Sequence, residues 1–139
     1  MRYVGLDVGE RRIGVALSDV TGLIASAIGN VVRADNDLEG DLQKTADKIR
    51  ELGAEAVVIG LPKNMNGTIG PRAESVMAFS EALKEKIDIP MHFWDERLST
   101  VEAHKTMIDA GMSRNKRKNK VDSVAAVLIL QGFLDFKGR

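Results

Sequence analysis

The spacing of apolar residues along the chain changes once, and this change constrains the fold more than any other feature. Up to Val32, three short apolar stretches separated by glycine-containing turns have the pattern of β-strands: residues 2–9, 12–19 and 23–32. Strands joined by turns this short pair antiparallel. After Val32, apolar residues recur at intervals of three or four, which is the period of one helix face. The chain therefore begins as a β-meander and continues as alternating helices and strands.

Helices and strands alternate in the second part of the chain. The pattern predicts a helix over 38–52 closed by Gly53, a strand over 56–60, a helix opened by Pro71, a strand over 91–95, a helix from Ser99 to near Gly111 and a final helix over 121–136. The helix opened by Pro71 is predicted to bury Ala73, Val76, Met77, Ser80, Leu83 and Ile87. Right-handed crossovers make the later strands parallel to the first. The sequence thus predicts an α/β fold built on one mixed sheet.

The composition excludes several classes of protein. The 139 residues suit a single domain, 1–139, with no internal boundary. No cysteine is present, which excludes disulfides, thiolate metal sites and cysteine nucleophiles. The longest apolar run, 124–130, is too short to cross a bilayer, and the N-terminus lacks the apolar core of a signal peptide, so we expect a cytoplasmic protein without a membrane partner. The 20 basic and 20 acidic residues cancel, so only local clusters of charge could indicate nucleic-acid binding.

Three acidic residues occupy matching ends of the predicted elements. Asp7 ends the first strand, Glu96 follows the strand over 91–95, and Asp122 opens the final helix. The carboxyl ends of parallel strands meet at one edge of a sheet, so we expect the three carboxylates to converge. Their mutual repulsion would raise their pKa values, and a divalent cation would relieve it. Two such ions can activate water and stabilise the leaving oxygen of a phosphodiester.

Each of these acidic residues also has a purely structural interpretation. Asp7 could be a turn residue, Asp122 could be a helix N-cap, and Glu96 could pair with Arg97 on the surface. The hypothesis of a catalytic site therefore depends on all three residues standing at matching ends of their elements.

Two segments have the residue types needed to contact phosphate groups. The loop over 62–70 contains Gly67 and leads into a helix N-terminus, where exposed backbone N–H groups can bind an anion. It is not a P-loop, because no Gly-Lys-Ser or Gly-Lys-Thr occurs in the chain. The second segment, 113–120, is here called the basic segment and contains cations without an anion: Arg114, Lys116, Arg117, Lys118 and Lys120. Its position directly before Asp122 favours a phosphate-contacting role over plain solvated surface.

Four motifs in order resemble the YqgF/RuvX family of RNase H-like proteins. They are YVGLDVGERRIGVALSD, VVIGLPKNMNGTIGPRA, WDERLST and KVDSVAAVLILQGFL, and they extend from Tyr3 to Leu134. The resemblance implies an RNase H-like α/β fold, with a five-stranded mixed sheet of order 3-2-1-4-5, an antiparallel second strand and flanking helices. It also implies a metal-dependent nuclease, since the family is described both as Holliday junction resolvases and as nucleases that mature the precursor of small-subunit (16S) ribosomal RNA.

The same resemblance implies roles for individual residues. Asp7 in GLDVG, Glu96 in DERLST and Asp122 in KVDSVAA match the acidic positions of the family, so they are expected to be catalytic and to bind two Mg²⁺ or Mn²⁺ ions. Phosphate contacts are expected from the basic segment and from Arg12, Asn64, Gly67 and Arg97. The expected partner is structured RNA, such as pre-rRNA, or branched DNA. The oligomeric state stays open, with a homodimer as one alternative.

One position departs from the related RuvC-type enzymes. Those enzymes take their second carboxylate from the fourth strand, whereas here that strand ends in Gly60 and the carboxylate of Glu96 comes from the fifth. The geometry of the metal site and the substrate preference therefore cannot be carried over from RuvC. A fourth ligand, Asp95 or Asp19, also stays open.

Two other functions remain as alternatives. The stretch GLDVGERRIGVAL also resembles the first phosphate loop of actin-like and sugar-kinase-like phosphotransferases, but those proteins need two such lobes to enclose ATP, and 139 residues supply one. The other alternative is a non-catalytic RNA-binding factor for ribosome assembly, in which the acidic residues are caps or relics. Cleavage in the presence of Mn²⁺ distinguishes a nuclease from both.

Overall fold

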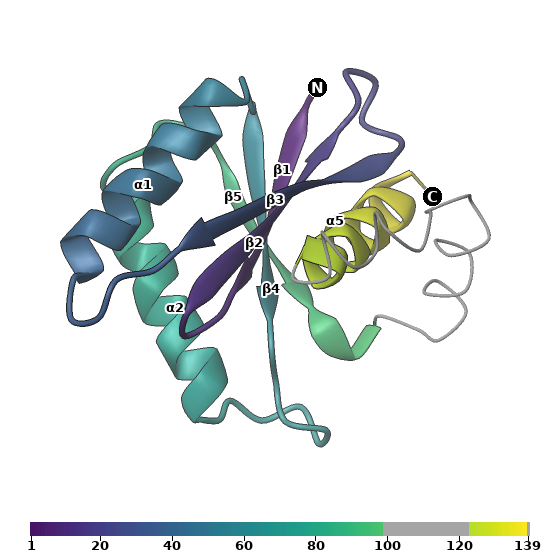
Figure 1. Ribbon diagram of the computed structural model, residues 1–139. Coiled ribbons are helices and arrows are strands. Elements are labelled where there is room, and N and C mark those ends of the chain that lie inside the picture. The colour runs from purple at the N-terminus through teal and green to yellow at the C-terminus, as the bar shows by residue number, and fades with distance from the viewer. Residues whose placement is uncertain (99–122, 139) are drawn as a thin grey trace.

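The computed structural model of the chain describes residues 1–98 and 123–138 (Figure 1). The elements in chain order are β1 (Tyr3–Val8), β2 (Arg12–Ser18), β3 (Ala25–Val32), α1 (Leu38–Glu51), β4 (Ala56–Leu61), α2 (Pro71–Lys84), β5 (Met91–Asp95), a single 3-10 turn (Glu96–Leu98) and α5 (Val124–Lys137). The helix predicted over 99–111 and the basic segment lie outside the described residues. Within the described ranges, no helix has the length and apolar character needed to span a membrane.

The sheet has the strand order that the sequence predicts. Its five strands lie in the order β3-β2-β1-β4-β5. β2 pairs antiparallel with both β1 and β3, while β1, β4 and β5 are mutually parallel. The cause is the length of the connections, because a tight turn returns the chain antiparallel whereas a crossover helix returns it parallel. The first strand, which carries Asp7 one residue before its end, therefore lies in the centre of the sheet.

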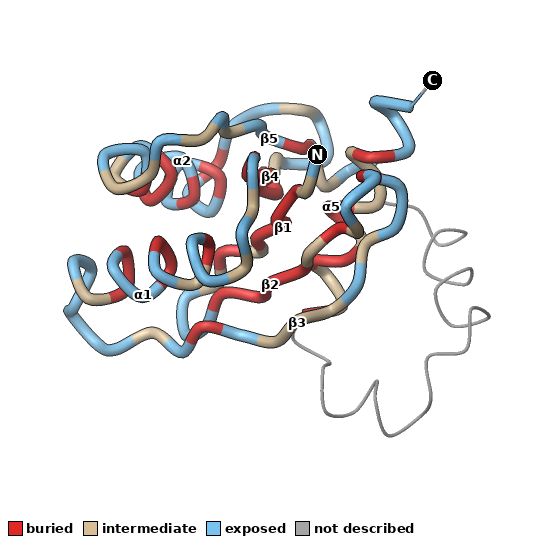
Figure 2. Tube along the Cα trace, turned by 90° about the horizontal axis from the view of Figure 1, so that it is seen from above, coloured by how far each residue is buried: buried red, intermediate tan, exposed pale blue. Residues whose placement is uncertain are grey.

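Different helices cover the two faces of the sheet. α1 and α2 lie on one face and α5 on the other (Figures 1 and 2). Alternation along β1 sends Val4 and Leu6 into the core beneath α1 and α2, and sends Tyr3 into the core beneath α5. Gly5 also faces α5, and Asp7 shares that face because it lies two residues further along the strand. Asp7 therefore lies on the face of the sheet that α5 covers.

Two glycines let α5 lie directly against the sheet. A Cβ atom on Gly5 would lie 2.7 Å from the Leu130 Cβ and 3.0 Å from the Ala126 carbonyl oxygen. A Cβ atom on Gly60 would lie 2.8 Å from the Ile129 Cγ1 atom. Separations this short are steric clashes, so the missing side chains permit the close approach. Small side chains are therefore needed on the strands as well as on the helix.

Three local expectations were wrong. α2 ends at Lys84, so Ile87, which was expected on its buried face, lies beyond the helix and is half-buried. The third strand begins at Ala25 rather than Leu23, because the Asp19 carboxylate accepts hydrogen bonds from the N–H groups of Leu23 and Ile24 at 2.8 and 2.9 Å and holds them in a turn. In α2, Met77 is 40% exposed, whereas Phe79, which was not predicted to be buried, is 3% exposed. The other boundaries agree to within a few residues, including the positive φ of 66° at Gly53 after α1.

Candidate active site

Asp7 and Glu96 lie at the same edge of the sheet. Asp7 stands near the end of β1, and Glu96 is the first residue after the parallel strand β5. Strand β4 lies between β1 and β5. Its residue Gly60 pairs with Trp94 of β5 and comes directly after Ile59, which pairs with Leu6 of β1. A Cβ atom on Gly60 would lie 3.1 Å from the Glu96 Cγ atom. The glycine therefore leaves room for the side chain of Glu96 beside β4.

The two carboxylates influence each other electrostatically. Burial raises the pKa of Asp7, and the positive charge of Arg72 partly offsets this effect. Burial also raises the pKa of Glu96, with a further contribution from the negative charge of Asp7, and Arg72 again opposes the shift. Within the described part of the chain, neither carboxylate accepts a hydrogen bond or forms an ion pair. Among the described residues, the charge of Arg72 is the one that opposes these upward pKa shifts, and it does so only in part.

Arg97 does not pair with Glu96, so the proposed structural role of Glu96 in such an ion pair was wrong. The Arg97 guanidinium instead binds the Asp95 carboxylate through Nε and Nη2, at 3.0 and 2.6 Å from Oδ2. This contact lowers the pKa of Asp95. A third nitrogen, Nη1, donates to the Met65 carbonyl at 3.3 Å. Arg97 thus joins Asp95 to the loop between β4 and α2, and the Asp95 charge is already balanced.

The loop between β4 and α2 contains the predicted phosphate ligands Asn64 and Gly67. The Asn64 N–H donates to the Thr68 carbonyl at 2.9 Å, and the Gly67 N–H donates to the Asn64 carbonyl at 2.8 Å. Gly67 has a φ of 87°, which favours glycine, and a Cβ atom there would lie 3.2 Å from Arg97 Nη1. Both residues therefore shape the loop, and their contact with phosphate stays a prediction.

Asp19 lies away from this edge. It follows β2, which is antiparallel to β1, so its position corresponds to the start of β1 rather than the end. The Tyr3 N–H donates to the neighbouring Ser18 hydroxyl at 2.8 Å, which shows this directly. Hydrogen bonds from the Ile24 N–H, the Thr21 hydroxyl and the Leu23 N–H lower the pKa of Asp19. Asp19 therefore stabilises a turn and does not join Asp7 in one metal site.

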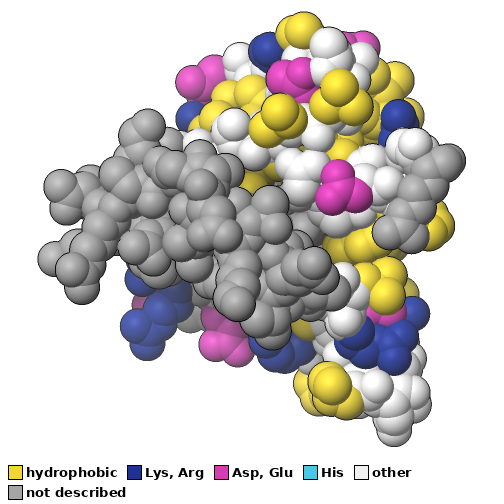
Figure 3. Space-filling view, turned by 90° about the vertical axis from the view of Figure 1, so that its right-hand side faces the viewer, with side chains coloured by type: hydrophobic (Ala, Val, Ile, Leu, Met, Phe, Trp, Pro, Cys, Tyr) yellow, Lys and Arg dark blue, Asp and Glu magenta, His cyan; other side chains and the backbone are white. Residues whose placement is uncertain are grey.

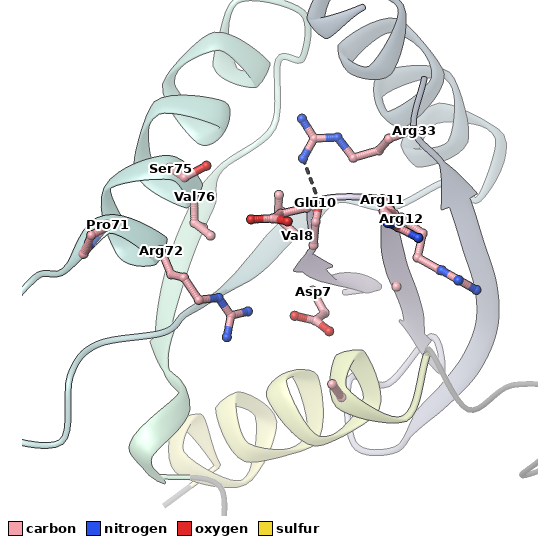
Figure 4. A pocket seen from close by; sticks show the side chains of 13 residues that line it. Asp7, Val8, Glu10, Arg11, Arg12, Arg33, Pro71, Arg72, Ser75 and Val76 are labelled. Atoms are coloured by element: carbon pink, nitrogen blue, oxygen red, sulfur yellow. Dashed lines mark hydrogen bonds between the residues drawn. The ribbon is translucent and has the colours of Figure 1, made fainter. Parts of the chain in front are cut away.

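A cleft of about 610 Å³ opens beside Asp7 (Figure 4). Its walls are the β1–β2 turn, the first turns of α2 and the start of α5, and its lining residues are Asp7, Val8, Gly9, Glu10, Arg11, Arg12, Gly14, Arg33, Pro71, Arg72, Ser75, Val76 and Ala125. Four of these are arginines and two are acidic. Lys and Arg side chains also gather at the lower end of the space-filling view, where β1, β4 and β5 end (Figure 3). A cationic wall beside a carboxylate suits a phosphodiester backbone.

Of these four arginines, only Arg12 was predicted from the sequence to belong to the site. Arg33 follows β3, which runs in the same direction as β1, so the rule that identified Asp7 could also have identified Arg33. Arg72 carries a weaker signal, since it stands in the first turn of α2 directly after the loop that contains Asn64 and Gly67. Arg11 belongs to the turn between β1 and β2.

Arg33 fixes the turn that forms the cleft wall. Its Nη1 donates to the Gly9 carbonyl at 2.8 Å, and its Nε donates to the Asp41 carboxylate of α1 at 2.9 Å. The guanidinium lies 5.1 Å from the centroid of the Phe79 ring of α2. The Asp41 carboxylate also accepts the Ala34 N–H at 2.9 Å. This group of contacts, here called the Arg33 clamp, joins the β1–β2 turn to both helices on that face.

The donor set of the described residues fits a hard divalent cation. Asp7 and Glu96 supply carboxylate oxygens, the ligands that Mg²⁺ and Mn²⁺ prefer, and burial raises the pKa of both groups. No group of three or more metal-ligating side chains occurs within residues 1–98 and 123–138. Asp122, the third expected ligand, lies outside these ranges, and so do Arg114, Lys116, Arg117, Lys118 and Lys120. Ala125 of α5 lines the cleft.

The sheet order and the helices on both faces define an RNase H-like fold of the resolvase type. The chain aligns with "T. thermophilus RuvC in complex with Holliday junction substrate" at a TM-score of 0.67 and 12% identity, covering 99% of this chain and 96% of that chain. It aligns with the fowlpox virus Holliday junction resolvase at a TM-score of 0.58 and 12% identity, covering 98% and 99%. At identities this low, the structural similarity establishes the fold and nothing further.

Sequence comparison then establishes the family. The family described as "RuvX: Holliday junction resolvase" matches residues 1–136, so the chain belongs to it. The chain is 53% identical over 135 residues to the "Putative pre-16S rRNA nuclease" of Desulforamulus reducens, covering 97% of each protein. It is 49% identical over 140 residues to the protein of the same name from Clostridium beijerinckii, covering 100% of this chain and 99% of the relative. The predicted family and the predicted enzyme class, a nuclease, are confirmed.

Proposed function

We propose that this chain is a metal-dependent endonuclease that hydrolyses phosphodiester bonds in structured nucleic acid. The observation that carries the proposal is the meeting of Asp7 and Glu96 at one edge of the sheet, beside a cleft lined by arginines. A partly buried pair of carboxylates favours a bound cation, and a cleft lined by arginines favours an anionic ligand. A nucleic-acid backbone together with Mg²⁺ or Mn²⁺ satisfies both requirements.

The residues divide into two groups by role. Asp7 and Glu96, with Asp122, would hold the metal ions, and two ions are expected. When bound, the ions supply the positive charge that activates the attacking water and stabilises the leaving oxygen. Arg12 in the cleft wall would contact the backbone of the substrate. Arg97 and the loop that carries Asn64 and Gly67 would position the same backbone on the β5 side of the site.

Maturation of the 5′ end of pre-16S rRNA is the reaction we propose first. The support comes from the names of relatives that match this chain over nearly its whole length. Resolution of four-way DNA junctions is the second reaction, supported by the description of the family. Both substrates present a folded, branched phosphodiester backbone, and the described residues offer charge and shape for either. The proposal places this activity in the cytoplasm, with a homodimer as the alternative to a monomer.

The test compares two substrates under the same conditions. A labelled pre-16S rRNA fragment and a labelled four-way DNA junction are incubated with the protein in EDTA, in Mg²⁺ and in Mn²⁺. We expect metal-dependent cleavage of the RNA by the wild type and none by Asp7→Asn. Cleavage of the junction alone would reassign the substrate.

Two outcomes would overturn the nuclease proposal. Binding of both substrates without cleavage in either metal would support the RNA-binding assembly factor. Thermal stabilisation by ATP, together with an absence of nucleic-acid binding, would support the phosphotransferase. An Asp47→Asn variant is the control, because Asp47 is exposed on α1 and pairs only with groups of that helix.

A further inference from the structure

Arg72 lines the cleft beside Asp7, and no hydrogen bond or ion pair to another described residue holds its side chain. It stands in the first turn of α2 and is exposed. Its side chain extends from the helix into the cleft toward Asp7 (Figure 4). Its guanidinium forms no hydrogen bond or ion pair with any residue in the described part of the chain. No polar contact within residues 1–98 and 123–138 therefore holds the guanidinium in place.

The charge of Arg72 nevertheless acts on both carboxylates. It opposes the upward pKa shift of Asp7 and also that of Glu96. Arg33 and Arg97 differ from it, because Arg33 is held by the Arg33 clamp and Arg97 is held by Asp95. Arg72 thus combines a position in the cleft, a guanidinium without a hydrogen bond or ion pair among the described residues, and an electrostatic influence on Asp7 and Glu96.

We infer that Arg72 is the residue that binds the substrate phosphate beside the carboxylate pair, and that it exchanges partners when cations bind. Without a cation, its charge partly balances Asp7 and Glu96. With the carboxylates occupied, that balance is no longer needed, and the guanidinium is free to bind the non-bridging oxygens of a phosphodiester. Its planar fork matches two phosphate oxygens, which a lysine ammonium cannot do. This inference rests on the proposed function.

The inference predicts effects of opposite sign on two ligands. Arg72→Gln removes a positive charge near the metal site, so Mn²⁺ should bind the free protein roughly fivefold to tenfold more tightly. The same variant lacks the cation that binds the phosphate, so nucleic acid should bind more weakly. A residue with only a structural role would weaken both interactions or change neither. The two readouts together therefore separate the two roles.

Arg72→Lys separates the charge from the shape of the side chain. It keeps the positive charge, so its Mn²⁺ affinity should equal that of the wild type. It lacks the planar fork, so it should restore only part of the nucleic-acid affinity. Arg50→Gln is the matched control, because Arg50 is an exposed arginine in the last turn of α1, which leads to the start of β4 at the other edge of the sheet. It should change neither affinity.

The experiment measures Mn²⁺ binding to the free protein by titration calorimetry, and binding of labelled RNA in Ca²⁺ and in EDTA over a series of salt concentrations. In Ca²⁺, the log–log salt slope of Arg72→Gln should be smaller by about 0.7–0.9 than that of the wild type, which corresponds to one neutralised phosphate. In EDTA, the two slopes should be closer, because Arg72 then faces the carboxylates. Circular dichroism should confirm that each variant is folded.

The controls separate failure of this inference from failure of the proposed function. If Asp7→Asn abolishes Mn²⁺ binding while Arg72→Gln matches the wild type in both measurements, the role of Arg72 is refuted and the nuclease site stands. If Asp7→Asn binds Mn²⁺ as the wild type does, the metal site itself is refuted. Weaker Mn²⁺ binding by Arg72→Gln would also overturn the inference, since it contradicts the expected sign.

Discussion

The carboxylates of Asp7 and Glu96 are costly to the fold when no cation is bound. Burial raises the pKa of each group, and the charge of Asp7 adds to the shift of Glu96. An acid whose pKa is higher in the folded than in the unfolded state destabilises the fold while it is ionised. The site is therefore electrostatically strained without metal, and a neutral residue of the same shape should relieve the strain.

Asp7→Asn tests this cost directly. The free variant should melt at the same temperature as the wild type or higher, although a typical substitution destabilises by about 1 kcal/mol. Mn²⁺ should raise the melting temperature of the wild type more than that of the variant, because only a bound ligand shifts the folding equilibrium. Matched thermal melts with and without Mn²⁺ provide the measurement. An identical metal shift in both proteins would remove Asp7 from the ligand set and return it to a turn residue.

Gly60→Ala tests the space between the carboxylates. The added Cβ atom would lie 2.8 Å from Ile129 Cγ1 and 3.1 Å from Glu96 Cγ. Because Ile129 is 1% exposed, it has little room to move, and overpacking should lower the free energy of unfolding by about 1–3 kcal/mol. We also expect weaker binding of Mn²⁺, since Glu96 is displaced from Asp7. Urea unfolding and Mn²⁺ titration give the two quantities.

The double variant Gly60→Ala with Ile129→Val separates packing from the position of Glu96. Removing the terminal methyl of Ile129 makes room on the helix side, so stability should partly return. Mn²⁺ affinity should stay low, because the contact with Glu96 remains. Full recovery of both quantities would mean that the glycine serves only the approach of α5.

At the scale of elements, the Arg33 clamp determines where the β1–β2 turn lies. The ion pair between Arg33 and Asp41 is shielded from solvent, with side chains 18% and 3% exposed. Burial alone would raise the pKa of Asp41, but the Ala34 N–H and the Arg33 guanidinium outweigh it and leave the pKa below its usual value. The charged form of Asp41 therefore stabilises the fold, in contrast to the charged form of Asp7.

Asp41→Asn should lower the free energy of unfolding by roughly 2–4 kcal/mol, because it leaves the partly buried Arg33 guanidinium without its carboxylate partner. The sign of the pH dependence follows from the lowered pKa. The difference in free energy of unfolding between wild type and variant should be constant at neutral pH. It should begin to shrink below about pH 4, where Asp41 of the unfolded chain takes up a proton, and it should vanish below the pKa that Asp41 has in the folded protein. Urea unfolding across this range measures it.

Asp47→Asn is the matched control for the clamp. Asp47 lies on the same helix, but its ion pair with Arg50 is exposed, with side chains 64% and 55% accessible. Its removal should change stability by less than about 0.5 kcal/mol at any pH. An equal decrease in stability in both variants would mean that Asp41 acts through helix charge rather than through the clamp.

The positions of the helices and strands could largely be predicted from the sequence, whereas the exact set of buried residues in α2 could not. The period of three and four identified Ala73, Val76, Ser80 and Leu83 as buried, and they are. Met77 and Phe79 flank this stripe on opposite sides, so periodicity treats them equally. The structure buries Phe79, whose ring is covered by Arg33, and exposes Met77. The neighbouring element decides which flank is covered, and no local pattern contains that information.

At the scale of the whole molecule, we predict that the basic segment contributes to nucleic-acid binding. Replacing Arg114, Lys116, Arg117 and Lys118 with Ala should weaken nucleic-acid binding and leave folding intact. If these residues neutralise phosphates, the log–log salt slope should shrink by about 0.7–0.9 for each phosphate that the variant no longer neutralises. Binding titrations at several salt concentrations measure the slope. An unchanged slope would identify the segment as solvated surface.

The sequence by itself determined the topology and one side of the site. Connection lengths set which strands are antiparallel, and strand ends set the edge at which Asp7 and Glu96 stand, because both depend on local periodicity and on general rules of chain crossover. Tertiary structure alone decided which charges are balanced. Within residues 1–98 and 123–138, Asp95 pairs with Arg97, Asp41 pairs with Arg33 and Asp19 accepts hydrogen bonds from its own turn, whereas Asp7 and Glu96 have only the partial compensation of Arg72. The compensation of Asp7 and Glu96 depends on Arg72, which belongs to a distant part of the chain and lies in the cleft beside Asp7 only after α2 has packed against the sheet.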